Sequence, residues 1–238
     1  MLPRGLGIWY DALEETNKKQ IVLATAVLFA LALAGCVSTN TQTNSLFGLI
    51  ETGTPQSIQN AIDQGSDVNA KGKGGITPLI AAVLFNRNPE VISTLLKAGA
   101  DTEARNKDGI TALMFAAAHS PDPAVVTTLL KGGADISARD KDGRTPLMWA
   151  AGFNQNLEVT TELLKAGADL NAKDKRDVTA LMYAAANNKN SDVIMTLLAA
   201  GADAKAKDST GKTAFESAQK NANLKDTDAY RKLEEASQ

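Results

Sequence analysis

A four-residue motif recurs at a constant interval of 34 residues, and this period constrains the fold more than any other feature of the chain. Each copy is a Thr, then Pro or Ala, then two further residues that are mostly apolar. A unit this short cannot bury its own apolar face and must stack on its neighbours. The chain is therefore predicted to be a solenoid, an architecture that mostly holds other molecules. The copies are Thr77-Pro78-Leu79-Ile80, Thr111-Ala112-Leu113-Met114, Thr145-Pro146-Leu147-Met148, Thr179-Ala180-Leu181-Met182 and Thr213-Ala214-Phe215-Glu216.

Composition removes several classes of function. The chain of 238 residues has a formal net charge of -2, so it lacks the basic surplus that nucleic-acid binding needs, and we expect no nucleic-acid partner. Cys36 is the only cysteine, which excludes an intramolecular disulfide. His119 is the only histidine, so a metal site built from Cys and His is also out of reach. No metal and no cofactor are expected.

The second unit, residues 77–110, shows how each repeat is predicted to fold. Thr77-Pro78 begins a helix, with Pro in the first turn, where its missing N–H has no cost. Asn88-Pro89 begins a second helix, and Gly99 ends it as the C′ residue. The ten residues that follow form an extended finger with a tight turn near its tip. N-cap candidates in the same register are Thr54, Asn88, Asp122, Asn156 and Asn190.

These repeats resemble the ankyrin family over roughly residues 43–238. The Gly-Ala-Asp runs, the Thr-Pro/Ala-Leu starts and the finger glycines at 75, 109, 143 and 211 carry the resemblance. Tetratricopeptide repeats share the period but lack the finger. The resemblance implies an all-α repeat solenoid of stacked helix-turn-helix units with β-turn fingers. The units are expected near 43–76, 77–110, 111–144, 145–178, 179–212 and 213–238, and both ends are expected to act as caps.

Two departures from the family pattern have structural consequences. Apolar residues replace the family's histidine in the fourth motif position, as at Met114 and Met148, so we expect packing rather than polar bridges there. Asp177 replaces a fingertip glycine. If that position has a positive φ, Asp tolerates it better than most residues do.

The N-terminal region resembles a bacterial lipoprotein signal. In residues 18–35, Lys18-Lys19 precede an apolar run of 15 residues, which is short for a bilayer span of ~20 residues. The run closes in Leu33-Ala34-Gly35-Cys36, which is similar to a lipobox. The resemblance implies cleavage before Cys36 and lipid attachment to it, with residues 36–42 as a polar tether. The alternatives are an incidental cysteine or an uncleaved signal anchor.

The lipobox resemblance also implies a location: the bacterial cell envelope, facing the periplasm. Val37, where retained lipoproteins have Asp, favours the outer over the inner membrane. Residues 1–17 form an atypical extension, because Asp11, Glu14 and Glu15 are unusual so near a signal's basic start. A start site assigned too far upstream is the expected explanation, and an added functional segment is the alternative.

The predicted partner-binding surface is the concave face that fingers and first helices line in ankyrin stacks. Aromatic residues recur there one helical turn apart, and cationic finger residues form a rim. The alternative is that the rings only fill gaps between adjacent helices. Predicted partner-binding residues are Phe85, Phe115, His119, Trp149, Phe153 and Tyr183, with Lys107, Lys141, Arg144, Lys175 and Arg176.

The sequence favours a binding protein over an enzyme. It offers no nucleophile with a base and an orienting group, and no Gly-rich phosphate loop. Asp101, Asp135, Asp169 and Asp203 recur with the repeat and are interpreted as turn and capping groups. The predicted function is a lipid-anchored protein–protein interaction scaffold in the envelope, with no small-molecule substrate. The alternatives are an immunity-like inhibitor of a toxin or hydrolase and, less favoured, a membrane-anchored cytosolic scaffold.

Overall fold

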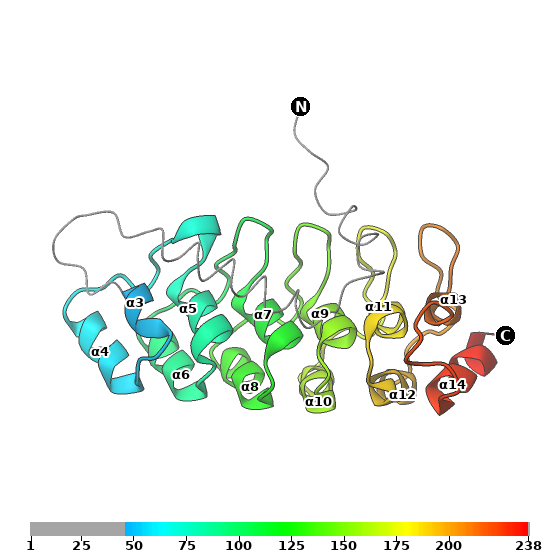
Figure 1. Cartoon of the computed structure of the whole chain (residues 1–238). Coiled ribbons are helices and arrows are strands. Elements are labelled where there is room, and N and C mark those ends of the chain that lie inside the picture. The colour runs from blue at the N-terminus through cyan, green and yellow to red at the C-terminus, as the bar shows by residue number, and fades with distance from the viewer. Residues whose placement is uncertain (1–45, 238) are drawn as a thin grey trace. The chain divides into compact units, whose positions relative to one another are not determined.

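The computed structural model describes residues 46–237, which lie within one compact unit, and all regular structure in this part of the chain is helical. The helices alternate between two layers, and the fingers extend beyond the layer of first helices (Figure 1). Each helix packs on its counterpart in the next repeat. The expected all-α repeat solenoid is thereby confirmed.

The two layers have the following bounds. The first helices are α3 (Leu46–Ile50), α5 (Pro78–Ala81) continued by the π-helical turn η3 (Ala82–Asn86), α7 (Ala112–His119), α9 (Pro146–Phe153), α11 (Ala180–Asn187) and α13 (Ala214–Ala218). The second helices are α4 (Pro55–Asp63), α6 (Pro89–Lys97), α8 (Pro123–Lys131), α10 (Leu157–Lys165), α12 (Ser191–Ala199) and α14 (Asp228–Ser237). A short 3₁₀ turn, η2 (Lys73–Gly75), lies at the tip of the first finger.

The helix boundaries follow the predicted capping chemistry. The motif threonine is an N-cap in all five copies, and its hydroxyl accepts the N–H three residues on; for Thr145 and Met148 the distance is 3.4 Å. All five predicted N-caps of the second helices are confirmed as well. Thr54 accepts the N–H three residues on, whereas the side-chain oxygen accepts the N–H two residues on at Asn88, Asp122, Asn156 and Asn190. Glycine follows each second helix from α4 to α12 with φ between 87 and 94°, as at Gly99, a conformation with little cost for glycine alone.

Apolar residues of the motif form the core between repeats. The fourth motif position is buried, with exposures of 0% at Ile80 and Met114, 1% at Met148 and 2% at Met182. The expected packing at the place of the family histidine is thus confirmed. Each second helix from α6 to α12 carries two adjacent leucines that differ in burial. In α6, for example, Leu95 is fully buried, whereas Leu96 is only partly buried against the core.

A row of buried or partly buried asparagines ties most repeats to the one before. The Nδ2 atom of Asn188 donates to the backbone oxygens of Ala151 at 2.8 Å and Asn154 at 2.9 Å, both in the preceding repeat. Asn86, Asn154 and Asn221 bridge in the same way. The bridge is interrupted at the corresponding Ser120, whose hydroxyl bonds within its own loop. Because buried carbonyls need donors, these amides fix how adjacent repeats stack.

The predictions for the N-terminal region lie outside the described residues. They concern the extension 1–17, the signal 18–35, the tether 36–42 and Cys36. Among the helices of residues 46–237, none has the length and apolar character to cross a bilayer.

One buried hydroxyl identifies a site where stability can be gained. Thr160 of α10 is fully buried, and its Oγ1 has no hydrogen-bond partner among the described residues. The same register holds Ile92, Val126 and Ile194 in the other second helices. Thr160→Val removes an unpaired polar group at equal volume, so we expect the free energy of unfolding to rise by about 1 kcal/mol in urea denaturation.

The neighbouring Thr161→Val is the matched control, because the hydroxyl of Thr161 donates to the backbone oxygen of Leu157 at 3.0 Å. It should bring no gain. Equal effects of the two substitutions would contradict the assignment of Thr160 as an unpaired donor.

Candidate functional site

The predicted binding residues lie on the fingers and the first helices, on the side that we call the finger-side face. Lys107, Lys141, Lys175 and Arg176 are exposed at successive fingertips. Phe85, Phe115, Trp149 and Phe153 are partly buried, and His119 is exposed at the end of α7. This face therefore combines cations with partly accessible aromatic rings.

Backbone hydrogen bonds join the fingertips into one row. The N–H of Lys141 donates to the oxygen of Asp108 at 3.1 Å, and that of Lys175 to Asp142 at 2.9 Å. The same bond links Lys107 to Gly74 and Ser209 to Arg176. Each finger is also closed internally, as by the 3.1 Å bond from the N–H of Asp140 to the oxygen of Arg144. The fingertip residues are thus held in place before any partner binds.

Aspartates shape both halves of each finger. The predicted turn role of Asp101, Asp135, Asp169 and Asp203 is confirmed, because each Oδ1 accepts the N–H two residues on, at 2.8–3.0 Å. Closer to the tip, Asp140 Oδ1 accepts two backbone N–H groups at 2.9 Å. At the tip itself, Asp177 has φ 59°, so this glycine position does have a positive φ, which Asp tolerates better than most residues do.

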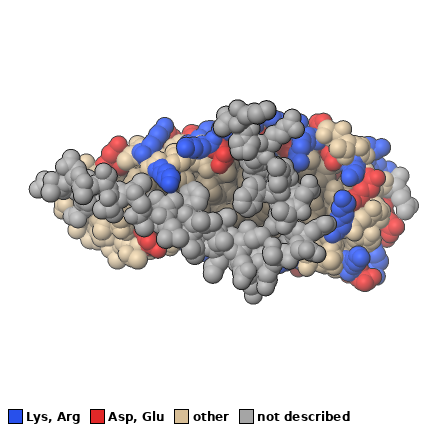
Figure 2. Space-filling model, turned by 45° about the horizontal axis from the view of Figure 1, so that its top comes forward, with Lys and Arg blue, Asp and Glu red and all other residues tan. Residues whose placement is uncertain are grey.

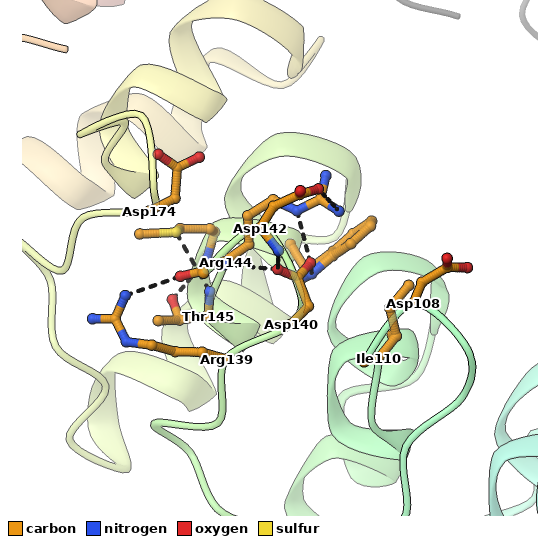
Figure 3. Close-up of polar contacts among 12 residues, drawn as sticks. Asp108, Ile110, Arg139, Asp140, Asp142, Arg144, Thr145 and Asp174 are labelled. Carbon is orange, nitrogen blue, oxygen red and sulfur yellow. Dashed lines mark hydrogen bonds and ion pairs between the residues drawn. The ribbon is translucent and has the colours of Figure 1, made fainter. Parts of the chain in front are cut away.

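Arg144, Asp140 and Trp149 form the most developed cluster of the face (Figure 3). The Nε of Arg144 donates to Asp140 Oδ2 at 2.7 Å, and its Nη2 lies 3.1 Å from Asp142 Oδ2. The guanidinium stacks 4.2 Å from the ring centroid of Trp149, whose Nε1 donates to the same Asp140 Oδ2 at 3.1 Å. Asp140, 6% exposed, therefore fixes both the cation and the indole.

Arg144 keeps its positive charge although it is partly buried. Burial by itself would lower the pKa of Arg144, but the hydrogen bond and the negative charge of Asp140 outweigh it, so the pKa is raised. The guanidinium thus stays protonated at any physiological pH.

Trp149 and Phe153 form the only ring contact among the predicted aromatic residues of the described chain. Their centroids are 5.3 Å apart at an interplanar angle of 40°. They lie one helical turn apart on α9, so they present one continuous aromatic surface. The predicted row of aromatics is reduced to this central pair, with Phe115 and Phe85 on the repeats before it.

Tyr183 differs from the expectation for an exposed aromatic. It is only 3% exposed, and its hydroxyl donates to Asp174 Oδ2 at 2.7 Å. Cβ and the ring pack on Gly152, where an added Cβ would lie 3.4 Å from the Tyr183 Cβ. The small residue on α9 lets Tyr183 fill the space between α9 and α11, so this side chain supports the face rather than offering contact area.

His119 occupies a charged neighbourhood. The side chain of His119 is exposed, but neighbouring groups still desolvate part of its imidazole. This desolvation, and then the positive charge of Arg87, lower the pKa of His119 from the usual value of 6.5. His119 is therefore neutral at pH 7 and adds no charge to the finger-side face.

Asp140 and Asp174 were not among the predicted site residues. The signal for them exists in the sequence, since Asn106, Asp140, Asp174 and Asp208 share one register. In the sequence these residues look like ordinary turn formers, and the Oδ1 atoms of Asp140 and Asp174 do accept backbone N–H groups of the turns. Their second oxygens hold Trp149 and Tyr183, which only the packing of finger on helix reveals.

No metal-ligand set is found in the described part of the chain, because residues 46–237 contain no cluster of three His, Cys, Asp or Glu side chains placed to hold an ion. Asp140 and Asp174 are each committed to backbone N–H groups and an aromatic partner. The geometry of this face is that of a positioned contact surface.

Comparison with known proteins agrees with the architecture. The family model described as ankyrin repeats in three copies matches residues 46–140, 85–174, 116–208 and 147–228, which together cover more than half of the chain. No curated protein matches the chain.

Because the hydroxyl of Tyr183 is buried and donates to Asp174, we expect the stability of the protein to fall at alkaline pH. Burial and then the bond to Asp174 raise the pKa of Tyr183 above its usual value of 10.0. Above about pH 10 the unfolded chain loses the phenol proton while the folded chain keeps it, so the free energy of unfolding falls as pH rises. Tyr183→Phe should flatten this fall in urea titrations between about pH 9 and 11.

Tyr230→Phe is the matched control, since Tyr230 is a partly buried tyrosine of the last unit. This variant should keep the alkaline fall in stability, because it leaves the hydrogen bond from Tyr183 to Asp174 in place. A Tyr183→Phe profile parallel to the unmodified one would contradict the assigned hydrogen bond.

Proposed function

Because the chain belongs to the ankyrin repeat family, we propose that it is a non-enzymatic scaffold that binds a protein partner through the finger-side face. Ankyrin repeats indicate a protein–protein interaction scaffold, and the family is typically non-enzymatic. What is specific to this chain is where the partner binds and how the chain is held in the cell.

The observation that carries the proposal is the Trp149–Phe153 pair beside Arg144. Tryptophan, tyrosine and arginine dominate the binding energy of protein interfaces, especially where they are held in advance by neighbouring groups. Here the indole is fixed by Asp140 and stacked by Arg144, yet both rings stay partly exposed. A pair that served only to fill the core would be fully buried, as Leu147 and Met148 of the same helix are.

The polar groups of this face support binding rather than catalysis. Its titratable side chains are paired or exposed: Asp140 pairs with Arg144, Asp174 pairs with Tyr183, and His119 is exposed at a helix end. None of these sets joins a nucleophile to a base and an orienting group. The exposed lysines of the fingertips would supply a polar rim on the finger side of the aromatic pair.

We also propose that lipid on Cys36 anchors the chain in the bacterial envelope, facing the periplasm, at the outer membrane in preference to the inner one. The support is the lipobox-like Leu33-Ala34-Gly35-Cys36 after an apolar run, with Val37 at the next position. Two or more acyl chains give stable anchoring, so the repeats would act as a tethered adaptor.

The aromatic pair gives the first test. Trp149→Ala with Phe153→Ala removes the central contact area, so we expect the affinity for a partner captured from envelope extracts to fall by at least about 30-fold, or ~2 kcal/mol. Unfolding should remain cooperative. Assaying the captured partner's activity separates an adaptor, which leaves it active, from an immunity-like inhibitor, which blocks it.

Phe215→Ala with Tyr230→Ala is the matched control, because these rings form a similar pair in the last unit, with centroids 5.2 Å apart. This variant should keep its partner. If the Trp149 and Phe153 variant binds normally, or if its melting transition collapses, the rings serve only to pack the helices.

The anchor is tested separately. Cys36→Ala removes the thiol that would carry the lipid, so radioactive palmitate labelling should disappear and the protein should move to the soluble fraction. Ser38→Ala, two residues further on, should keep both the label and the membrane association. Labelling that persists in Cys36→Ala would contradict a lipid on this residue.

A further inference from the structure

Positive charge is concentrated on the outer halves of the fingers. We define the finger ends as residues 70–76, 104–110, 138–144, 172–178 and 206–212. They carry twelve Lys and Arg against six Asp, whereas the rest of the chain carries 13 Lys and Arg against 21 Asp and Glu, from totals of 25 and 27. The formal charge is thus +6 on the finger ends and -8 elsewhere. Figure 2, with the finger side turned forward, shows Lys and Arg recurring along this side.

Three of the six finger-end aspartates are engaged by groups of the fingers and first helices themselves. Asp140 and Asp174 are each 6% exposed and are bonded to backbone N–H groups. Asp142 pairs with Arg144 at 3.1 Å. In contrast, Lys73, Lys107, Lys141 and Lys175 are exposed and form no ion pair with any described residue. The field at the fingertips is therefore positive.

The four fingertip lysines stand at a regular spacing. Each finger contributes two backbone segments, and hydrogen bonds join both segments within a finger and the tips of adjacent fingers. Neighbouring hydrogen-bonded segments lie about 4.7–4.9 Å apart, so equivalent fingertip positions repeat roughly every 9.5 Å. Because the backbone bonds fix this row, little conformational entropy of the backbone is lost when a ligand binds.

An extended polypeptide can match this spacing. A polyproline II segment rises about 3.1 Å per residue with three residues per turn, so residues three apart lie on one face and ~9.3 Å from each other. We propose that the fingertip row binds an extended acidic segment of a protein partner, with carboxylates at every third residue opposite Lys73, Lys107, Lys141 and Lys175. This inference rests on the proposed binding function and specifies the chemistry of its partner.

A protein segment fits the fingertips better than other polyanions do. Asp108, Asp142 and Asp177 are exposed at the same tips, next to the cations. A continuous array of phosphates, as on DNA or an anionic bilayer, would bring negative charge against these carboxylates. Spaced carboxylates can meet the lysines and avoid the aspartates.

The test uses the full-length protein and two fluorescent peptides of equal composition. One peptide has four repeats of Glu-Pro-Pro, and the other has the same residues with its four glutamates in one block. Fluorescence anisotropy at ~0.15 M salt should show tighter binding of the spaced peptide. Lys107→Glu with Lys141→Glu and Lys175→Glu should weaken its binding about tenfold, and the effect should fade at ~1 M salt.

The control variant has Lys131→Glu, Lys189→Glu and Lys225→Glu, which changes net charge equally at exposed residues outside the finger ends. It should change binding less than about twofold, since charges beyond a Debye length of ~8 Å are screened at ~0.15 M salt. Both triple variants should melt at the temperature of the unmodified protein. Equal weakening by both variants, equal binding of both peptides, or tighter binding of duplex DNA or phosphatidylglycerol vesicles would overturn the proposal.

The same assay separates this inference from the proposed function. The Trp149→Ala, Phe153→Ala variant retains the fingertip lysines and should still bind the spaced peptide. If the fingertip charges have no effect while the aromatic variant still loses its natural partner, the acidic segment is wrong and the binding function stands.

Discussion

The structure depends on the way in which each repeat satisfies the polar backbone of the repeat before it. Where a first helix ends, its last carbonyls lack helical partners and lie between repeats, away from water. Asn86, Asn154, Asn188 and Asn221 supply the missing donors, each with two bonds of 2.7–3.1 Å. Apolar contact alone would permit sliding, whereas these directional bonds set one arrangement of neighbouring repeats. At Ser120 the asparagine bridge is missing, and the fingertip bond from the N–H of Lys141 to the oxygen of Asp108 joins these two repeats instead.

That arrangement determines what the fingers can do. Once first helices stack in one register, equivalent fingertips meet and their backbones bond in sequence from Gly74 to Ser209. Side chains on the tips then inherit the spacing of the repeats. The stacking of repeats therefore sets the geometry of the proposed binding face. It fixes the relative positions of the aromatic pair, the arginine cluster and the row of lysines, which no single repeat could do.

Much of this was predictable from sequence, because the repeat and its caps are local. Thr145, Asn156 and Gly99 each mark a helix boundary through their own hydrogen bonding or φ preference, and all three act as expected. The fingertip Asp177 adopts a positive φ in place of a glycine. These residues need only their immediate neighbours to be understood.

The site was less predictable, because it depends on contacts between elements. Tyr183 shares the register of Trp149, yet it is buried because Gly152 on the preceding helix leaves room for its ring. Asp140 and Asp174 resemble turn residues in sequence, and only the fold of finger against helix directs their second oxygens to an indole and a phenol. Exposure at Trp149 is a property of the stack and has no signature in the motif.

Hydrogen–deuterium exchange of the protein bound to its partner tests the central claim most directly, since it reports on every repeat at once. The account predicts added protection in residues 104–119 and 138–153, which contain the fingers and first helices around the aromatic pair. Exchange in α8 and α10 should be unchanged. Protection confined to these second helices, with none on the fingers, would contradict it.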